Sequence, residues 1–364
     1  MKSAISGLIA AFSAALLSTS AFAQERVVHV YNWSDYIDES VLEEFTKETG
    51  IRVVYDVFDS NELLETKLLA GGSGYDVVVP TGPFLARQIS AGVFQKLDKS
   101  KLPNLENMWP EVSERLAKYD PGNEYAVNYM WGTTGLGYNV AKLKAALGDV
   151  PVESWDIIFK PENAEKLKAC GINILDASDE TFAIAMNYIG KDPDSKDAAD
   201  LEAGGDVYKA IRPYVKTFNS SGYIDDLANG DICLSIGWSG DVLQAKSRAE
   251  EAGNGVEVEY VIPEEGTYMW FDNLAIPADA KNVDEAHEFI NFLMKPDVIA
   301  KASDYVQYAN GNLASQALLD EEVFKNPSVY PDEETMKKLF TISPYGPREQ
   351  RVLNRVWTAV KTGN

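Results

Sequence analysis

Short β-branched segments alternate with amphipathic segments in the first eighty residues, and this order limits the possible folds more than any other feature. The predicted strands cover residues 27–31, 51–57 and 76–80. Asp38 and Ser60 stand at N-cap positions of the two intervening helices, and Gly50 and Gly71 stand where these helices end. A β-α-β-α-β order predicts a parallel sheet with helices on both of its faces. We therefore expect an α/β fold.

A second α/β unit follows further along the chain. Its predicted strands cover residues 172–175 and 232–238, with a helix that begins at about Glu180. Extended runs cover residues 125–138 and 256–262, and a strand over residues 270–276 comes next. Two extended crossings between two α/β units predict a hinged, two-lobed protein. We expect lobe 1 to hold residues 24–133 and about 263–305, and lobe 2 to hold residues 134–262 and about 306–364.

The first 23 residues have the pattern of a secretory signal. Lys2 precedes the apolar runs 5–12 and 14–17, and Ala21-Phe22-Ala23 places small residues ahead of a cleavage site before Gln24. The runs are shorter than the roughly 20 apolar residues that a membrane span needs. We expect this signal peptide to be removed and the protein to be exported.

The chain has two cysteines, Cys170 and Cys233. In an oxidising compartment they can pair in one way, and closing a loop of this length stabilises a fold by about 4 kcal/mol in the chain-entropy model. Two buried thiols are the alternative. A zinc site is not expected, because further ligands are missing.

The chain is strongly acidic, with 33 Lys and Arg against 56 Asp and Glu and a net charge of −23. This balance argues against binding to nucleic acids and to anionic lipid surfaces, both of which demand basic residues. It suits a cationic ligand, but it suits mere solubility as well. Charge alone therefore does not decide the ligand, and no cofactor is expected.

Three segments near predicted strands combine an indole with a carboxylate. They are WSDY at residues 33–36, WSGD at 238–241 and WFD at 270–272. Ligands of open parallel sheets bind beyond the carboxyl ends of the strands. Burying an ammonium group requires a carboxylate partner or an aromatic face, and indole rings also provide walls for methylene groups. This set suits a linear diamine or triamine, although each Trp could be a core residue and each Asp a helix cap.

Four long motifs carry a resemblance to a known family. They are YNWSDYI at residues 31–37, YDVFDSNE at 55–62, GYDVVVP at 74–80 and LANGDIC at 227–233. With these motifs the chain resembles the bacterial periplasmic polyamine-binding proteins, the putrescine and spermidine receptors of ABC importers. The resemblance implies a type II periplasmic-binding fold that closes on its ligand and docks on a membrane permease. It implies a monomer in the periplasm and no catalysis.

The resemblance also assigns roles to the first lobe. Trp33 and Tyr36 become aromatic walls, and Ser34 and Asp35 hold one amine end. Thr81 supplies a hydroxyl group where the putrescine-type receptors have a Ser.

In the other segments the resemblance implies further carboxylates and tryptophans around the ligand. Asp241 and Asp272 hold the opposite terminal ammonium, while Trp238 and Trp270 flank the methylene chain. The remaining family positions are Glu180, an acid of the second lobe whose neighbour Asp179 could take its place, and the late tyrosine Tyr308.

Two departures from the family bear on which polyamine is preferred. Pro83 stands where relatives have a small or aromatic hydroxyl residue, and its ring cannot donate a hydrogen bond. Trp270 stands where putrescine-preferring relatives usually have Phe and spermidine-preferring relatives have Trp. The larger ring adds wall for the longer triamine, so we expect spermidine to be favoured over putrescine.

Other functions fit the sequence less well. A secreted glycoside hydrolase could use paired carboxylates beside tryptophans. A Ser-His triad has only His29 and His287 to draw on, and both stand at structural positions. No ligand set for a ferric ion surrounds Tyr305 and Tyr308. A receptor for another organic cation or for amino acids stays open within the binding class.

Overall fold

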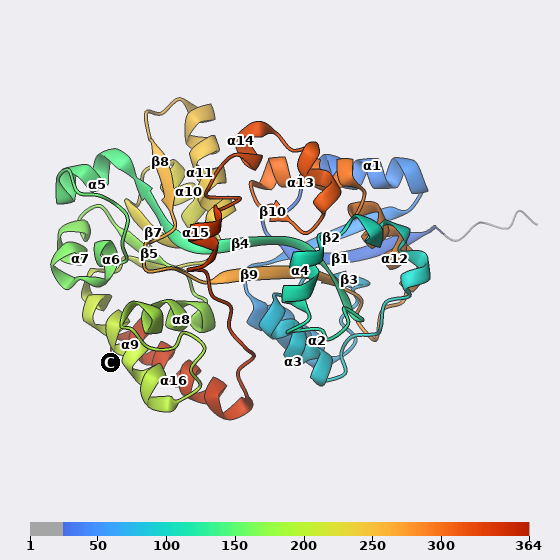
Figure 1. Cartoon of the computed structure of the whole chain (residues 1–364), viewed down its shortest axis with the longest axis horizontal. Helices are drawn as coiled ribbons and strands as arrows, with labels where there is room; N and C mark the ends of the chain where they lie inside the picture. The colour runs from blue at the N-terminus through green and yellow to red at the C-terminus, as the bar shows by residue number, and fades with distance from the viewer. Residues whose placement is uncertain (1–24, 364) are drawn as a thin grey trace, which may run out of the picture.

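The computed structural model describes residues 25–363, so the predicted signal peptide, residues 1–23, lies outside the described residues. Figure 1 shows two α/β lobes side by side, with strands β4 and β9 running between them. The predicted α/β class is confirmed. Within residues 25–363, no helix combines the length and the apolar character that crossing a membrane requires.

The first lobe is built on the predicted parallel strands. Strand β1 (Val27–Trp33) pairs in parallel with β2 (Arg52–Phe58) on one side and with β3 (Val77–Val78) on the other. Helices α1 (Glu39–Thr49) and α2 (Asn61–Ala70) connect them, capped as predicted by the side chains of Asp38 and Ser60. The third strand is shorter than expected, because the chain turns at Pro80 into α3 (Gly82–Ser90).

Strand β4 (Ala126–Asn139) passes through both lobes. Its first part, up to Thr133, pairs with β9 (Met269–Ala275), and its second part, from Thr134, pairs with β7 (Leu234–Trp238). The predicted second crossing at residues 256–262 is wrong. Strand β8 (Val258–Val261) pairs entirely with the second part of β4 and so belongs to the second lobe. The chain returns to the first lobe in the loop between β8 and β9.

The second lobe continues the sheet beyond β7. Strand β5 (Ile172–Ile174) lies between β7 and β6 (Thr217–Phe218) and is parallel to both. Cys170 and Cys233, which precede β5 and β7, form the predicted disulfide with their Cα atoms 5.4 Å apart. The disulfide therefore joins the amino ends of two neighbouring strands.

The remaining elements cover the sheet and extend its edges. In the second lobe they are α5 (Val140–Leu147), α6 (Asp156–Phe159), α7 (Pro161–Leu167), α8 (Ser178–Tyr188), α9 (Ala198–Ile211), η3 (Arg212–Tyr214), α10 (Tyr223–Ala228) and α11 (Ser239–Ala252). The others are η1 (Lys99–Lys101), η2 (Pro103–Asn107), α4 (Pro110–Leu116), α12 (Val283–Leu293), α13 (Pro296–Val306), β10 (Ala309–Asn310), η4 (Leu313–Ala317), α14 (Glu321–Phe324), α15 (Glu333–Met336) and α16 (Pro347–Thr362).

The C-terminal segment contacts both lobes. Strand β10 pairs with Met130 and Trp131 in the first part of β4, and η4 packs against α13 and η2. Helix α16 instead packs against α8 and α9, where Trp357 meets Phe182 and Tyr208 edge to face. The predicted placement of all residues from 306 to 364 in lobe 2 therefore needs correction for β10 and η4. The other predicted lobe limits stay a prediction.

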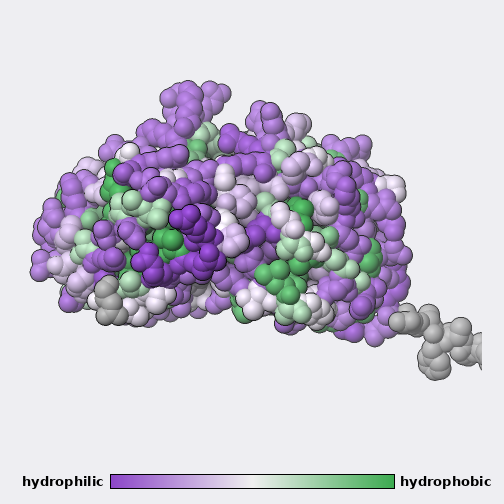
Figure 2. All heavy atoms as spheres, turned by 90° about the horizontal axis from the view of Figure 1, so that it is seen from below, coloured by the Kyte–Doolittle hydropathy of each residue, from purple (hydrophilic) through white to green (hydrophobic). Residues whose placement is uncertain are grey.

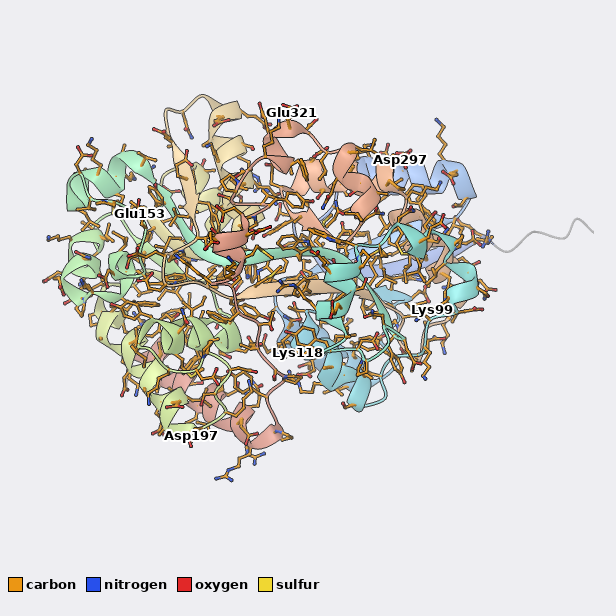
Figure 3. All side chains as sticks on the ribbon, viewed as in Figure 1. Lys99, Lys118, Glu153, Asp197, Asp297 and Glu321 are labelled. Carbon is orange, nitrogen blue, oxygen red and sulfur yellow. A yellow bond between two sulfur atoms is a disulfide. The ribbon has the colours of Figure 1, made fainter. Side chains whose placement is uncertain are left out.

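Charged side chains cover the outside of both lobes. Figure 3 labels six of them, and Lys118 lies where the lobes meet, 3.7 Å from Asp194 of the second lobe. Seen from below, the surface is mostly hydrophilic, with apolar residues in separate patches (Figure 2). This surface agrees with the acidic composition.

Candidate functional site

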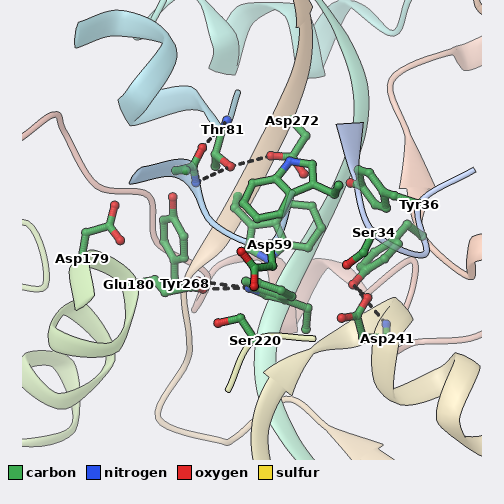
Figure 4. A pocket seen from close by; sticks show the side chains of 15 residues that line it. Ser34, Tyr36, Asp59, Thr81, Asp179, Glu180, Ser220, Asp241, Tyr268 and Asp272 are labelled. Carbon is green, nitrogen blue, oxygen red and sulfur yellow. Dashed lines mark hydrogen bonds between the residues drawn. The ribbon is translucent and has the colours of Figure 1, made fainter. Parts of the chain in front are cut away.

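A cavity lies between the lobes, at the carboxyl ends of β1, β2 and β7 (Figure 4). The structure brings ten of the eleven predicted ligand residues into its lining. These are Trp33, Ser34, Tyr36, Thr81, Glu180, Trp238, Asp241, Trp270, Asp272 and Tyr308. They come from both lobes, as expected for a ligand enclosed between them.

Aromatic rings form much of the cavity wall. The indole of Trp33 donates its Nε1–H to the carbonyl oxygen of Val79 at 2.9 Å, which fixes the orientation of the ring. Its ring centre lies 5.7 Å from that of Trp238 in the other lobe, at an interplanar angle of 73°. Trp270 and Tyr308 meet at 5.2 Å and 67°. These rings provide flat apolar and π-rich surfaces that suit methylene groups and cations.

Asp241 is held by two tyrosines. The hydroxyl of Tyr308 donates to Oδ1 at 2.7 Å, and the hydroxyl of Tyr223 donates to Oδ2 at 3.0 Å. Asp241 stands in the first turn of α11, and its backbone N–H donates to Tyr308 at 3.0 Å. Neutral donors thus fix the carboxylate in place, and it forms no ion pair within residues 25–363.

Asp272 is held in the same manner from the first lobe. The hydroxyl of Thr81 donates to its Oδ1 at 2.6 Å, and Asn61 donates to the Thr81 oxygen at 3.0 Å. The hydroxyl group expected at Thr81 is therefore present, and it orients the carboxylate of Asp272.

Glu180 lies near the amino end of α8 and contacts the strand shared by the lobes. The hydroxyl of Thr134 donates to its Oε2 at 2.5 Å, and the indole of Trp238 donates to its Oε1 at 3.1 Å. In Figure 4, Asp179 and Glu180 lie at the left of the cavity, Asp272 lies near the top beside Thr81, and Asp241 lies at the lower right. The acids are thus distributed along the cavity.

The charged groups in the lining are all acidic. Five carboxylates line the cavity, and no Lys, Arg or His is among its described lining residues. Burial raises the pKa of Asp241 and of Asp272 to about 7 and that of Glu180 to about 8, because desolvation disfavours their charged forms. A cation that enters the cavity would restore the balance of charge.

Asp35 is the one predicted ligand residue that the structure does not bring into this cavity. It has a left-handed backbone conformation with φ of 53°, and its carboxylate pairs with Arg248 of α11 at 2.6 Å. Arg248 also contacts Asp225 at 2.8 Å. Asp35 therefore joins the two lobes through this ion pair, and its role in holding an amine stays a prediction.

Five lining residues were not predicted as ligand residues. They are Asp59, Asn61, Asp179, Ser220 and Tyr268. The first two could have been found, because they follow β2 just as Ser34 follows β1. Asp179 was considered only as a replacement for Glu180, whereas the structure places both in the lining.

The comparisons with known proteins decide the family. Residues 40–331 match the model of the bacterial extracellular solute-binding proteins. The chain belongs to this family. A solute-binding protein is not an enzyme, so the glycoside hydrolase alternative is dropped.

Similar members of the family are known. The chain is 54% identical over its whole length to the putrescine-binding periplasmic protein PotF of Escherichia coli, of which 98% is covered. It is 56% identical over 94% of its length to the putrescine-binding periplasmic protein SpuD of Pseudomonas aeruginosa, of which 93% is covered. The solved structure of the spermidine/putrescine ABC transporter substrate-binding protein PotD of Streptococcus pneumoniae is 32% identical, with a TM-score of 0.75, and the match covers 93% of this chain and 99% of that one. The resemblance stated from the motifs is confirmed.

Proposed function

We propose that this solute-binding protein captures linear polyamines in the periplasm and delivers them to the membrane permease of an ABC importer. The observation that carries the proposal is the lining of the cavity, where five carboxylates and several aromatic rings face a space without a basic residue among its described lining. Ammonium groups separated by methylene chains match both features. The names of the relatives point to the same ligand class.

The same lining disfavours an amino-acid receptor. An amino acid carries a carboxylate, which needs a cationic or hydrogen-bond-donating partner when it is buried. The five carboxylates of the lining would repel it. A diamine or triamine avoids this conflict.

The ranking of spermidine above putrescine stays a prediction based on Trp270. Its indole lines the cavity and contacts Tyr308, so it adds apolar wall as expected. The two relatives that share more than half of their residues with this chain are named for putrescine. Affinities for both ligands are therefore required.

Closure of the two lobes is the proposed mechanism. A polyamine that contacts Trp33 in one lobe and Glu180 and Asp241 in the other would favour the closed form, and the permease would recognise that form. We further propose that residues 1–23 direct export and are removed, and that the protein works as a monomer.

Calorimetric titration tests the proposal. The protein without residues 1–23 is unfolded, washed and refolded to remove bound amines, and then titrated with putrescine, spermidine, cadaverine and a panel of amino acids. We expect submicromolar binding of at least one polyamine and no binding of amino acids. The absence of heat with every polyamine would overturn the proposal.

A further inference from the structure

The position of the Trp270 indole depends on a glycine in the neighbouring strand. Gly132 of β4 stands directly opposite Trp270 of β9 in the register of the sheet. A Cβ atom at position 132 would lie 2.7 Å from Cζ2 and 3.0 Å from Cη2 of Trp270. Side-chain carbons do not approach a Cβ this closely, so the outer ring of the indole occupies the space that a side chain at position 132 would need.

Backbone conformation does not explain a glycine at this position. Gly132 is not among the residues with a positive φ, so its backbone can accommodate alanine without strain. The side chains around position 132 explain why a glycine stands there. Besides the indole, the Oγ of Ser239 lies 3.0 Å from the place of the missing Cβ.

The indole is held by packing. Trp270 is 5% exposed, and its Nε1 has no hydrogen-bond partner within the described part of the chain. By contrast, the Trp33 and Trp238 indoles are anchored through Nε1 by Val79 and Glu180. The location of the Trp270 ring therefore follows from what lies beneath it, which is Gly132, and from Tyr308 at its side.

We propose that Gly132 is a positioning residue that sets how far the Trp270 indole reaches into the cavity, and thereby which polyamine length the cavity accepts. This inference rests on the proposed polyamine function. A methyl group at position 132 would push the ring off β4 and into the ligand space. A longer ligand needs more of that space, so spermidine loses more affinity than putrescine.

The test uses a small set of variants of the protein without residues 1–23. In Gly132→Ala we expect spermidine affinity to fall by about tenfold or more, which corresponds to about 1.4 kcal/mol, and putrescine affinity to fall less. Adding Trp270→Phe removes the second ring that carries Cζ2 and Cη2, so the double variant should recover the affinity of Trp270→Phe alone. Adding Ser239→Ala instead relieves only the other close contact and should restore nothing.

A second readout needs no ligand. The urea midpoint of the polyamine-free protein should fall in Gly132→Ala but not when Trp270→Phe is already present. Gly205→Ala, on α9 against Val356 of α16, is the control for crowding elsewhere and should leave the affinity ratio unchanged.

The outcomes separate the two proposals. Unchanged affinities in Gly132→Ala, or recovery through Ser239→Ala, would overturn the role of Gly132. If the unmodified protein bound no polyamine, the proposed function would fail and the statement about ligand length with it, while the urea midpoints would still show whether Gly132 positions the indole.

Discussion

The buried acids of the cavity make the polyamine-free protein sensitive to pH. The pKa values of Asp241 and Asp272 are raised to about 7 and that of Glu180 to about 8, whereas carboxyl groups of unfolded chains titrate near 4. Between about pH 4 and pH 8 the folded state therefore binds more protons than the unfolded state, and stability falls as the pH rises.

We expect the urea midpoint of the polyamine-free protein to be lower at pH 8 than at pH 5.5 through these groups. Polyamine affinity should change in the opposite direction, because the charged acids that bind ammonium are more populated at pH 8. Titrations at both pH values measure the affinity change. Equal affinities at the two values would show that these acids are already charged in the empty cavity.

Asp241 should contribute strongly to affinity. It is held by Tyr308 and Tyr223 and forms no ion pair within the described residues, so its charge is available to the ligand. We expect Asp241→Asn to weaken polyamine binding by about 2 to 3 kcal/mol, because it leaves an ammonium poorly paired. Calorimetry measures the loss. Asp304→Asn is the control, since this acid also has a raised pKa but lies outside the cavity lining.

At the scale of single residues, the sequence predicted most of the lining because strand ends carry ligand residues. It could not predict the direction of each side chain. Asp35 and Ser34 are neighbours, yet the left-handed backbone at Asp35 turns its carboxylate toward Arg248. The space above Gly132 that the Trp270 ring occupies could not be predicted either, because it depends on the register of two strands more than one hundred residues apart.

At the scale of elements, the predictions were accurate where local signals act. The N-caps Asp38 and Ser60 and the glycine stops lie where the sequence placed them. The pairing of β8 with β4, and of β10 with β4, could not be predicted, since it depends on tertiary packing of distant segments.

The disulfide gives a prediction at this scale. It joins the amino ends of β5 and β7, whereas the cavity lies at the carboxyl end of β7. Replacing Cys170 and Cys233 with Ala should lower the free energy of unfolding by about 4 kcal/mol, as expected for a loop of this length. Polyamine affinity should stay nearly unchanged. Urea unfolding and calorimetry on the same preparation check both parts, and a large loss of affinity would show that the disulfide shapes the cavity.

At the scale of the whole molecule, contacts between the lobes bear on the proposed closure. The ion pair of Asp35 and Arg248 joins the turn after β1 to α11, and the amide of Gln244 donates to the backbone oxygen of Asp35 at 3.3 Å. If the lobes close as proposed, such contacts lower the free energy of the closed form alone and so raise ligand affinity without touching the ligand.

Asp35→Asn and Arg248→Gln should therefore have equal and small effects. Both side chains are more than one third exposed, so the pair contributes no more than about 1 kcal/mol to closure, and added salt should weaken it. We expect the double variant to bind polyamines no worse than either single variant, because all three lose the same contact between the lobes, while the second pair of Arg248, with Asp225, lies within the second lobe. If Asp35 instead held an ammonium directly, its replacement alone would cost about 2 to 3 kcal/mol, and the Arg248→Gln effect would add to it. Calorimetric titration of the four proteins at low and high salt distinguishes a contact between the lobes from a contact with the ligand.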